Sequence, residues 1–213
     1  MLNQLDTSIE LAKWIDENGE KKTVTIQNYL ELVNQKDAKK DEIADFIYQR
    51  LFTRYLKPFL YESDDFNSQY KNGFSIMANC CLLIETLQSF KNGWGDSDKK
   101  SGQAFQQFLQ EESNFSDFTN GINLFKDIRC GILHQGETSG GWKINRGNKK
   151  GSKKLLKPLI DKTTKEINSI AFAKELDNSL KNYSDKLKNA EWDSETWDNF
   201  RTKMRRIIKN CQS

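Results

Sequence analysis

The chain of 213 residues is long enough for one domain with appended helices, and 36% of its residues are hydrophobic while 30% are charged. The formal net charge of +3 is too small to indicate a nucleic-acid partner by itself. No stretch approaches the ~20 consecutive apolar residues of a membrane span, and residues 1–10 lack the apolar core of a signal peptide. We therefore expect a cytoplasmic protein.

The N-terminal residues 1–40 are predicted to form a helical arm ahead of the main domain. The apolar residues between positions 9 and 15 have the spacing of a short helix that ends near Gly19. A second helical run covers residues 26–33, and a charged connector follows it.

The main domain is predicted over residues 41–190, where apolar residues recur at helical spacing. Pro58 is expected to end the first of its helices. The helix leading to position 134 is expected to be capped by Thr119 or Asn120. The predicted helices are, in chain order, 41–57, 74–90, 104–111, 122–134 and 170–187, followed by a basic-ended helical tail over 191–213.

The fold class predicted from these segments is all-α. Glycine-rich residues 136–151 form a loop, with room for a small β-hairpin that uses residues 142–145. Leu155, Leu156, Leu159 and Ile160 suit a second short strand or a turn of helix. The whole chain is expected to behave as one compact unit.

The four cysteines and the single histidine indicate no metal site. Cys80, Cys81, Cys130 and Cys211 form no Cys-x2-Cys pair, and one histidine cannot complete a zinc set unaided. The sequence also lacks the glycine-rich patterns that bind nucleotide phosphates or dinucleotides. We expect reduced, mostly buried thiols and neither a metal nor an organic cofactor.

Arg129 and His134 are the most informative pair in the sequence, because His134 is the only histidine and lies at a helix end. RNA can be cut by its own 2′-hydroxyl if one group takes the hydroxyl proton, another protonates the leaving oxygen, and a cation stabilises the phosphate. Imidazole suits the proton transfers, and arginine suits the phosphate. Five positions on an ideal helix are about 140° apart around the axis, so convergence requires the long arginine side chain or a distorted helix near Gly131.

A single histidine is one imidazole short if two are required. A two-fold homodimer that brings two copies of the helix end together supplies the second one. The histidine count therefore predicts a homodimer with a composite site.

The segment from Leu124 to His134 resembles the HEPN superfamily, in which an arginine and a histidine lie about four to six residues apart near a helix end. The helical segments 81–90 and 172–183 resemble the flanking helices, so the likeness covers about residues 40–190. It implies an up-and-down bundle of about four or five core helices. It also implies metal-independent RNA cleavage at a dimer interface, commonly in prokaryotic defence, CRISPR-linked or toxin systems. Many members carry Asn, Asp or His directly after the arginine, where this chain has Cys130.

Further residues are candidates for supporting roles. Glu85 lies in the most apolar helix and is a candidate to orient Arg129, or else a residue of a solvated edge. Between Glu137 and Asp161 the chain has seven basic residues and no acidic one, so this segment is a candidate to bind the RNA backbone. Trp142 is a candidate either to stack on a base or to pack internally. The basic candidates for RNA binding are Lys143, Arg146, Lys149, Lys150, Lys153 and Lys154.

Less specific interpretations exist for each feature. His134 is equally suited to bond a helix-end carbonyl, Arg129 to pair with Asp127 or Glu137, and the lysine segment to be a solvated loop. The function predicted is an endoribonuclease. The alternatives are a non-catalytic RNA-binding or protein-interaction module of a defence complex, favoured by Cys130, and a structural helical adaptor.

Overall fold

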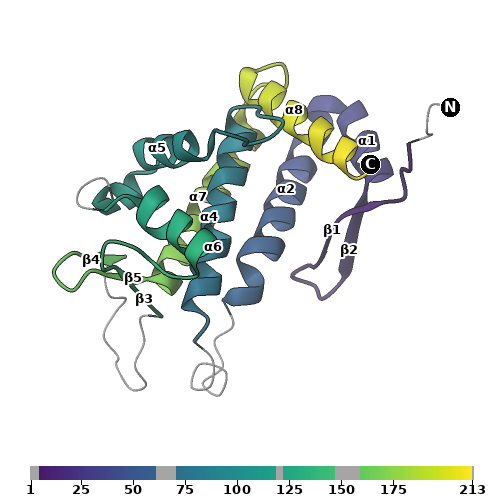
Figure 1. Ribbon diagram of the computed structural model, residues 1–213. Coiled ribbons are helices and arrows are strands. Elements are labelled where there is room, and N and C mark those ends of the chain that lie inside the picture. Colours follow the sequence, from purple (N-terminus) through teal and green to yellow (C-terminus); the bar gives the residue numbers. More distant parts are fainter. Residues whose placement is uncertain (1–4, 61–70, 119–121, 147–158, 213) are drawn as a thin grey trace. The chain divides into compact units, whose positions relative to one another are not determined.

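The computed structural model describes residues 5–60, 71–118, 122–146 and 159–212, and it is predominantly helical, as predicted (Figure 1). The chain divides into two compact units. The first contains residues 1–54, 89–96 and 180–213, and the second contains residues 55–88 and 97–179. In the described part of the chain, no helix combines the length and the apolar character needed to cross a membrane.

The first unit contains a β-hairpin and several helices or parts of helices. The helix α4 contributes its last residues and α7 its second half to this unit. Its elements are β1 (Glu10–Ile15), β2 (Lys21–Thr25), α1 (Ile26–Asn34), η1 (Lys36–Lys39), most of α2 (Lys40–Tyr55) and α8 (Glu195–Asn210). The predicted helices at 26–33, from position 41 and in the C-terminal tail are confirmed.

The prediction of a helix over residues 9–15 is wrong. Residues 10–15 form the strand β1, which pairs with β2 in an antiparallel hairpin. The turn is built by Asp16, whose carboxylate accepts hydrogen bonds of 2.9 Å from the backbone N–H groups of Asn18 and Glu20. Gly19 adopts a φ of 80°, which favours glycine. The Asn18-Gly19 dipeptide and the β-branched residues of β2 were the hairpin signals in the sequence.

The core of the first unit is aromatic. Phe200 lies at its centre, with ring centroids 5.8 Å from Phe90, 5.3 Å from Trp197 and 6.4 Å from Tyr29. Trp197 is fully buried, and its indole N–H donates a 3.0 Å hydrogen bond to the carbonyl of Leu187. These tryptophan and phenylalanine side chains are core residues, as predicted.

The second unit holds the motif. Its elements are η2 (Lys57–Phe59), most of α4 (Gly73–Lys91), α5 (Ser101–Glu111), η3 (Ser113–Phe118), η4 (Leu124–Cys130), α6 (Gly131–Gln135), β3 (Lys143–Asn145), β4 (Ile160–Asp161), β5 (Glu166–Asn168) and the first half of α7 (Ser169–Asn189). The helices predicted at 74–90, 104–111 and 170–187 are confirmed. The predicted caps Thr119 and Asn120 lie outside the described residues.

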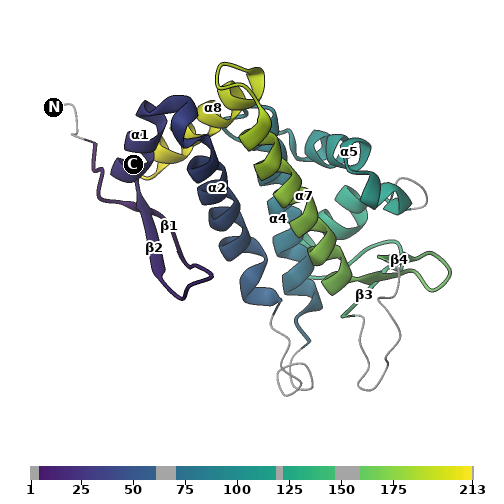
Figure 2. The same ribbon diagram turned by 180° about the vertical axis from the view of Figure 1, so that it is seen from behind.

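The glycine-rich segment leads into a small sheet. The strand predicted at 143–145 is present as β3, but it pairs in parallel with β5 and is not one arm of a hairpin. The antiparallel pair is β4 with β5, so the strand order is β3-β5-β4. The candidate strand residues Leu155 and Leu156 lie outside the described residues. Figure 2 shows this sheet at the N-terminal end of α7.

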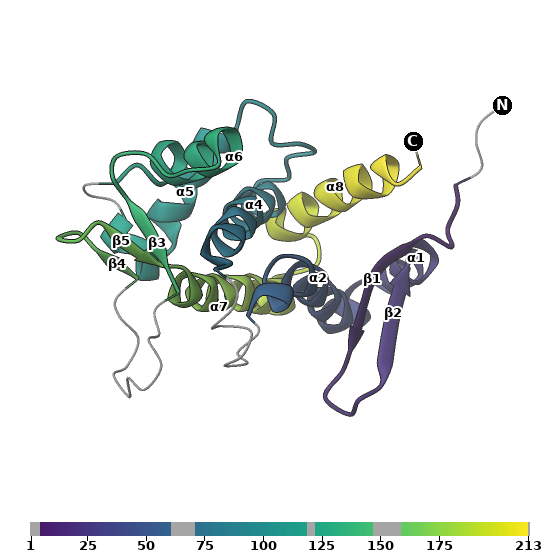
Figure 3. The same cartoon turned by 60° about the horizontal axis from the view of Figure 1, so that its bottom comes forward.

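The core of the second unit surrounds α4, whose Cys80, Leu83, Ile84 and Leu87 are fully buried. The phenylalanine rings of α5, η3 and α7 form an adjoining cluster. Phe172 lies at its centre, 4.9 Å from Phe115 and 5.3 Å from Phe118 between ring centroids. The helix α5 and the η4–α6 segment lie next to each other and beside α4 (Figures 1 and 3). Arg129 of η4 and Ser101 of α5 both donate hydrogen bonds to Glu85 of α4.

Candidate active site

Arg129 and His134 lie on either side of a change in helix type. The segment η4 is a π-helix, which begins after Asn123, whose side chain accepts a 2.9 Å hydrogen bond from the backbone N–H of Lys126. The short helix α6 follows and ends at Gly136, which has a φ of 68°. A π-helical turn is rare and is frequently found at functional sites, because it changes the direction of the side chains around it.

The structure brings the two side chains together. Arg129 Nη1 lies 3.3 Å from His134 Nε2. Arg129 lies near the end of the π-helical segment and His134 lies in α6, so the wider π-helical turn affects only the first steps between them. The long arginine side chain spans the remaining gap.

Glu85 fixes the guanidinium from the other side. Arg129 Nε donates a hydrogen bond of 2.8 Å to Glu85 Oε1, while the hydroxyl of Ser101 donates one of 2.7 Å to Glu85 Oε2. Glu85 is only 7% exposed, so it lies inside the protein and not on a solvated edge. Arg129 forms this ion pair with Glu85, and Asp127 instead accepts hydrogen bonds from the loop that follows α6.

The surroundings keep Arg129 charged. Burial disfavours the charge, but the hydrogen bond and the negative charge of Glu85 outweigh this effect and raise the pKa of the Arg129 guanidinium above its ordinary value. The guanidinium carbon also lies 5.6 Å from the centroid of the Phe125 ring. Arg129 is therefore a permanent, oriented cation.

His134 is exposed to solvent and open to a substrate. A guanidinium can only donate hydrogen bonds, so Nε2 accepts from Arg129 and the imidazole proton of this arrangement is assigned to Nδ1. An unprotonated Nε2 is the form that can take a proton from a hydroxyl group. The pair thus presents a proton acceptor beside a fixed positive charge.

The loop after α6 is tied to η4. The Ser139 hydroxyl donates a 3.0 Å hydrogen bond to Asp127 Oδ1, and its backbone N–H donates one of 2.8 Å to the Asp127 carbonyl. The chain passes so close to Gly131 that a Cβ built there would lie 2.5 Å from the carbonyl oxygen of Glu137. Gly131 is therefore required by packing and not by an unusual backbone angle.

Replacing Gly131 by alanine is expected to lower the free energy of unfolding by about 1–3 kcal/mol, because the methyl group displaces the 137–139 backbone. The matched control is Gly102→Ala, whose Cβ would meet Phe125 at an ordinary 3.6 Å. This control is expected to change stability by less than about 1 kcal/mol. Urea denaturation followed by circular dichroism measures both, and equal stabilities would contradict the close contact at Gly131.

Replacing Ser101 by alanine is expected to cost about 1 kcal/mol of stability, because Glu85 Oε2 loses a hydrogen bond while the Arg129 pair remains. Gln103→Ala on the exposed side of α5 is the control and is expected to be neutral within about 0.5 kcal/mol. Thermal and urea unfolding measure the difference. A Ser101→Ala variant as stable as the parent would show that the serine does not hold the carboxylate.

The cysteines near the site differ in environment. Cys80 and Cys81 are completely buried in α4, as predicted. Burial, with a smaller contribution from the charge of Glu85, raises the pKa of the Cys81 thiol well above its ordinary value. Cys130, next to Arg129, is only half-buried, so its prediction as a buried residue is correct in part. All four cysteines are free thiols.

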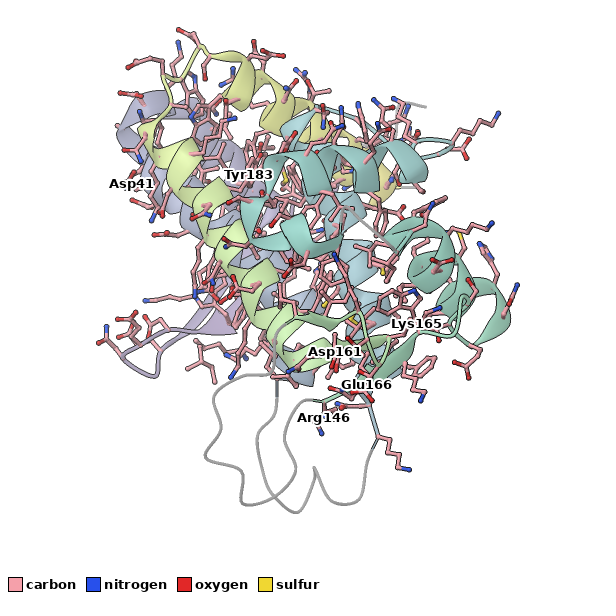
Figure 4. All side chains as sticks on the ribbon, turned by 90° about the vertical axis from the view of Figure 1, so that its left-hand side faces the viewer. Asp41, Arg146, Asp161, Lys165, Glu166 and Tyr183 are labelled. Carbon is pink, nitrogen blue, oxygen red and sulfur yellow. The ribbon has the colours of Figure 1, made fainter. Side chains whose placement is uncertain are left out.

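The basic segment is described only at its start. Lys143 is exposed and Arg146 is half-buried, whereas Lys149, Lys150, Lys153 and Lys154 lie outside the described residues. In the sheet, Lys143 is the register partner of Glu166, and Figure 4 shows Arg146 close to the acidic Asp161 and Glu166. The described basic residues of the segment therefore have acidic neighbours that come from outside it.

Trp142 is 5% exposed, which agrees with internal packing and not with stacking on a base. Its carbonyl accepts a hydrogen bond from the hydroxyl of Thr138. The tryptophan thus belongs to the folded loop that follows α6.

Comparison with models of protein families, with curated proteins and with solved structures found no match to this chain. The site itself is therefore the basis for inferring the function of this chain. Sequence reasoning identified Arg129, His134 and Glu85 but missed Ser101 and the contact of Phe125 with the guanidinium. No sequence signal connects Ser101 with Glu85, because their neighbourhood arises only when α5 packs beside α4.

Proposed function

We propose that the protein is a metal-independent endoribonuclease of the HEPN type. The observation that carries the proposal is the 3.3 Å approach of Arg129 Nη1 to His134 Nε2, with Arg129 anchored by the buried Glu85. The exposed imidazole and the permanent cation are the two groups that cleavage by the 2′-hydroxyl requires. The helical segments around them are compatible with the up-and-down bundle that the HEPN resemblance implies.

The chemistry follows from these groups. His134 takes the proton from a 2′-hydroxyl, and the oxygen attacks the adjacent phosphorus. The bond from phosphorus to the 5′-oxygen breaks, leaving a 2′,3′-cyclic phosphate and, after protonation, a 5′-hydroxyl. Arg129 stabilises the negative charge that builds on the nonbridging oxygens. Glu85 and Ser101 hold the guanidinium in place, so that its orientation is not lost to side-chain entropy.

Protonation of the leaving oxygen calls for a second imidazole, which we assign to a second copy of the chain. Two large apolar side chains near the pair support a protein contact at this place. Leu133, directly before His134, is 40% exposed, and Leu82, one turn before Glu85 on α4, is 41% exposed. Burying exposed leucines at a two-fold axis would stabilise a dimer around two Arg129–His134 pairs.

Replacing Leu133 by lysine is expected to weaken dimerisation about 30-fold or more, because it places a charge in the proposed apolar contact. Leu5→Lys is the matched control, since Leu5 is equally exposed at 42% but belongs to the other compact unit. Sedimentation velocity over a range of concentrations measures the association. A parent protein that is monomeric at micromolar concentration would contradict the shared site.

The decisive experiment is incubation of the parent and of His134→Ala with a mixed RNA pool in excess EDTA. The expected result is cleavage by the parent alone, with 2′,3′-cyclic phosphate ends on the products. Cleavage that requires added metal, or that persists in the variant, would overturn the proposal. The test is independent of which RNA is preferred.

A second candidate function is a non-catalytic RNA-binding or protein-interaction module of a defence complex. Cys130 favours it, because this half-buried thiol stands where many HEPN ribonucleases have a polar side chain after the arginine. Lys143 and the basic residues that follow it would then supply the RNA contacts. Equal retention of RNA by parent and His134→Ala, with no cutting, would support this function.

A further inference from the structure

A cavity lies in the same compact unit as the Arg129–His134 pair. It has a volume of about 360 Å³ and lies between α5 and the start of η4. Phe105 and Phe125 form two of its walls, with ring centroids 5.6 Å apart. Gln106 and Asn123, both exposed residues with amide side chains, are also among its lining residues.

Phe125 connects this cavity with the active site. The same ring that lines the cavity lies 5.6 Å from the guanidinium carbon of Arg129. Gly102, another lining residue, directly follows Ser101, which holds Glu85. Phe125 is therefore shared between the cavity lining and the surroundings of the Arg129 guanidinium.

The chemistry of the cavity differs from that of the pair. Every described side chain of its lining is uncharged, so it suits a neutral group and not a second phosphate. Its volume is at the low end of the roughly 300–1,000 Å³ of small-ligand sites, enough for one planar ring system. Aromatic walls with amide groups beside them are what a nucleobase needs for stacking and edge recognition.

We propose that this cavity, the base pocket, receives the nucleobase of a nucleotide that adjoins the scissile phosphate. The inference rests on the proposed ribonuclease function and extends it to substrate selection. Phe125 stacks on the base on one side and on Arg129 on the other, which couples base binding to the position of the phosphate anchor. The amide groups of Gln106 and Asn123 contact the edge of the base and select among bases.

The test uses binding, so that it does not depend on cleavage. Deoxydinucleoside monophosphates, which lack the 2′-hydroxyl and cannot be cut, are titrated into the parent protein and followed by NMR. Each is compared with analogues in which one or the other nucleotide is abasic. Removal of the base on one side is expected to weaken binding about tenfold, whereas removal on the other side has a smaller effect.

Two variants block the pocket. Leu109→Trp fills it from a half-buried lining position, and Gln106→Trp fills it from an exposed one, where folding is at least risk. Both are expected to abolish the tenfold difference between the intact and abasic ligands. Gln103→Trp, an exposed α5 residue outside the lining, is the matched control and keeps the difference.

The outcomes separate this inference from the proposed function. If the parent cuts RNA but binds intact and abasic ligands equally, the base pocket is wrong and the ribonuclease remains. If the parent never cuts RNA but shows a base preference that both blocking variants remove, the pocket stands and catalysis fails. If both blocking variants still bind the intact ligand more tightly than the abasic one, the base contact lies elsewhere and the inference is overturned.

Discussion

Replacing His134 by alanine is expected to lower the rate of RNA cleavage by about 10²–10⁴-fold, the usual contribution of a positioned acid–base group. The protein should remain folded, because His134 is exposed and its removal leaves the Arg129–Glu85 ion pair intact. Cleavage rates under single-turnover conditions, with substrate binding measured separately, check the effect. The loss is expected in the rate of the chemical step and not in RNA affinity.

The matched control for this change is Gln135→Ala, the adjacent exposed residue of α6. It should cleave within about twofold of the parent, since surface substitutions away from special features have small effects. If both variants lose the same activity, the imidazole has no special role and the helix end alone is important. A second control mixes the His134→Ala and Arg129→Ala proteins. If the site is shared by two subunits, mixed dimers contain one intact histidine and one intact arginine, and part of the cleavage activity should return.

Replacing Arg129 by alanine is expected to have two separate effects. Cleavage should fall by about 10²–10³-fold, as for the loss of one preorganised group that stabilises the transition state. The free energy of unfolding should fall by about 3 kcal/mol, because Glu85 is left as a buried carboxylate without the guanidinium that pairs with it. This loss is at the low end of the range for buried pairs, because the Arg129 side chain is 17% exposed.

A double-mutant cycle distinguishes the two effects. The double variant Glu85→Ala/Arg129→Ala should lose at least about 1 kcal/mol less free energy of unfolding than the two single variants lose together. The reason is that the double variant has no buried carboxylate at position 85 left without its arginine. Activity should not return in the double variant. Arg129→Lys keeps a positive charge but loses the planar, forked geometry, so stability should recover more than cleavage does. Additive stabilities would show that the pair is not coupled.

The helices were predictable from sequence because their signal is local. Apolar residues at 3.6-residue spacing place one face of each helix in the core, and α4, α5 and α7 begin and end within a few residues of the predicted limits. The hairpin at β1 and β2 was missed for the same reason. Six residues with mixed spacing fit a helix or a strand, and only the Asp16–Gly19 turn and pairing with β2 decide between them.

The sequence by itself determined most of the helices. It also singled out Arg129 and His134 as the candidate pair, because one histidine and one arginine at a helix end allow few alternatives. Only the tertiary structure decided that Glu85 holds Arg129, across 44 positions of chain, and that Ser101 holds Glu85. It also decided that an uncharged aromatic cavity lies beside them. The physical reason is that helix formation depends on neighbours along the chain, whereas the orientation of a charged side chain depends on groups that packing brings near it.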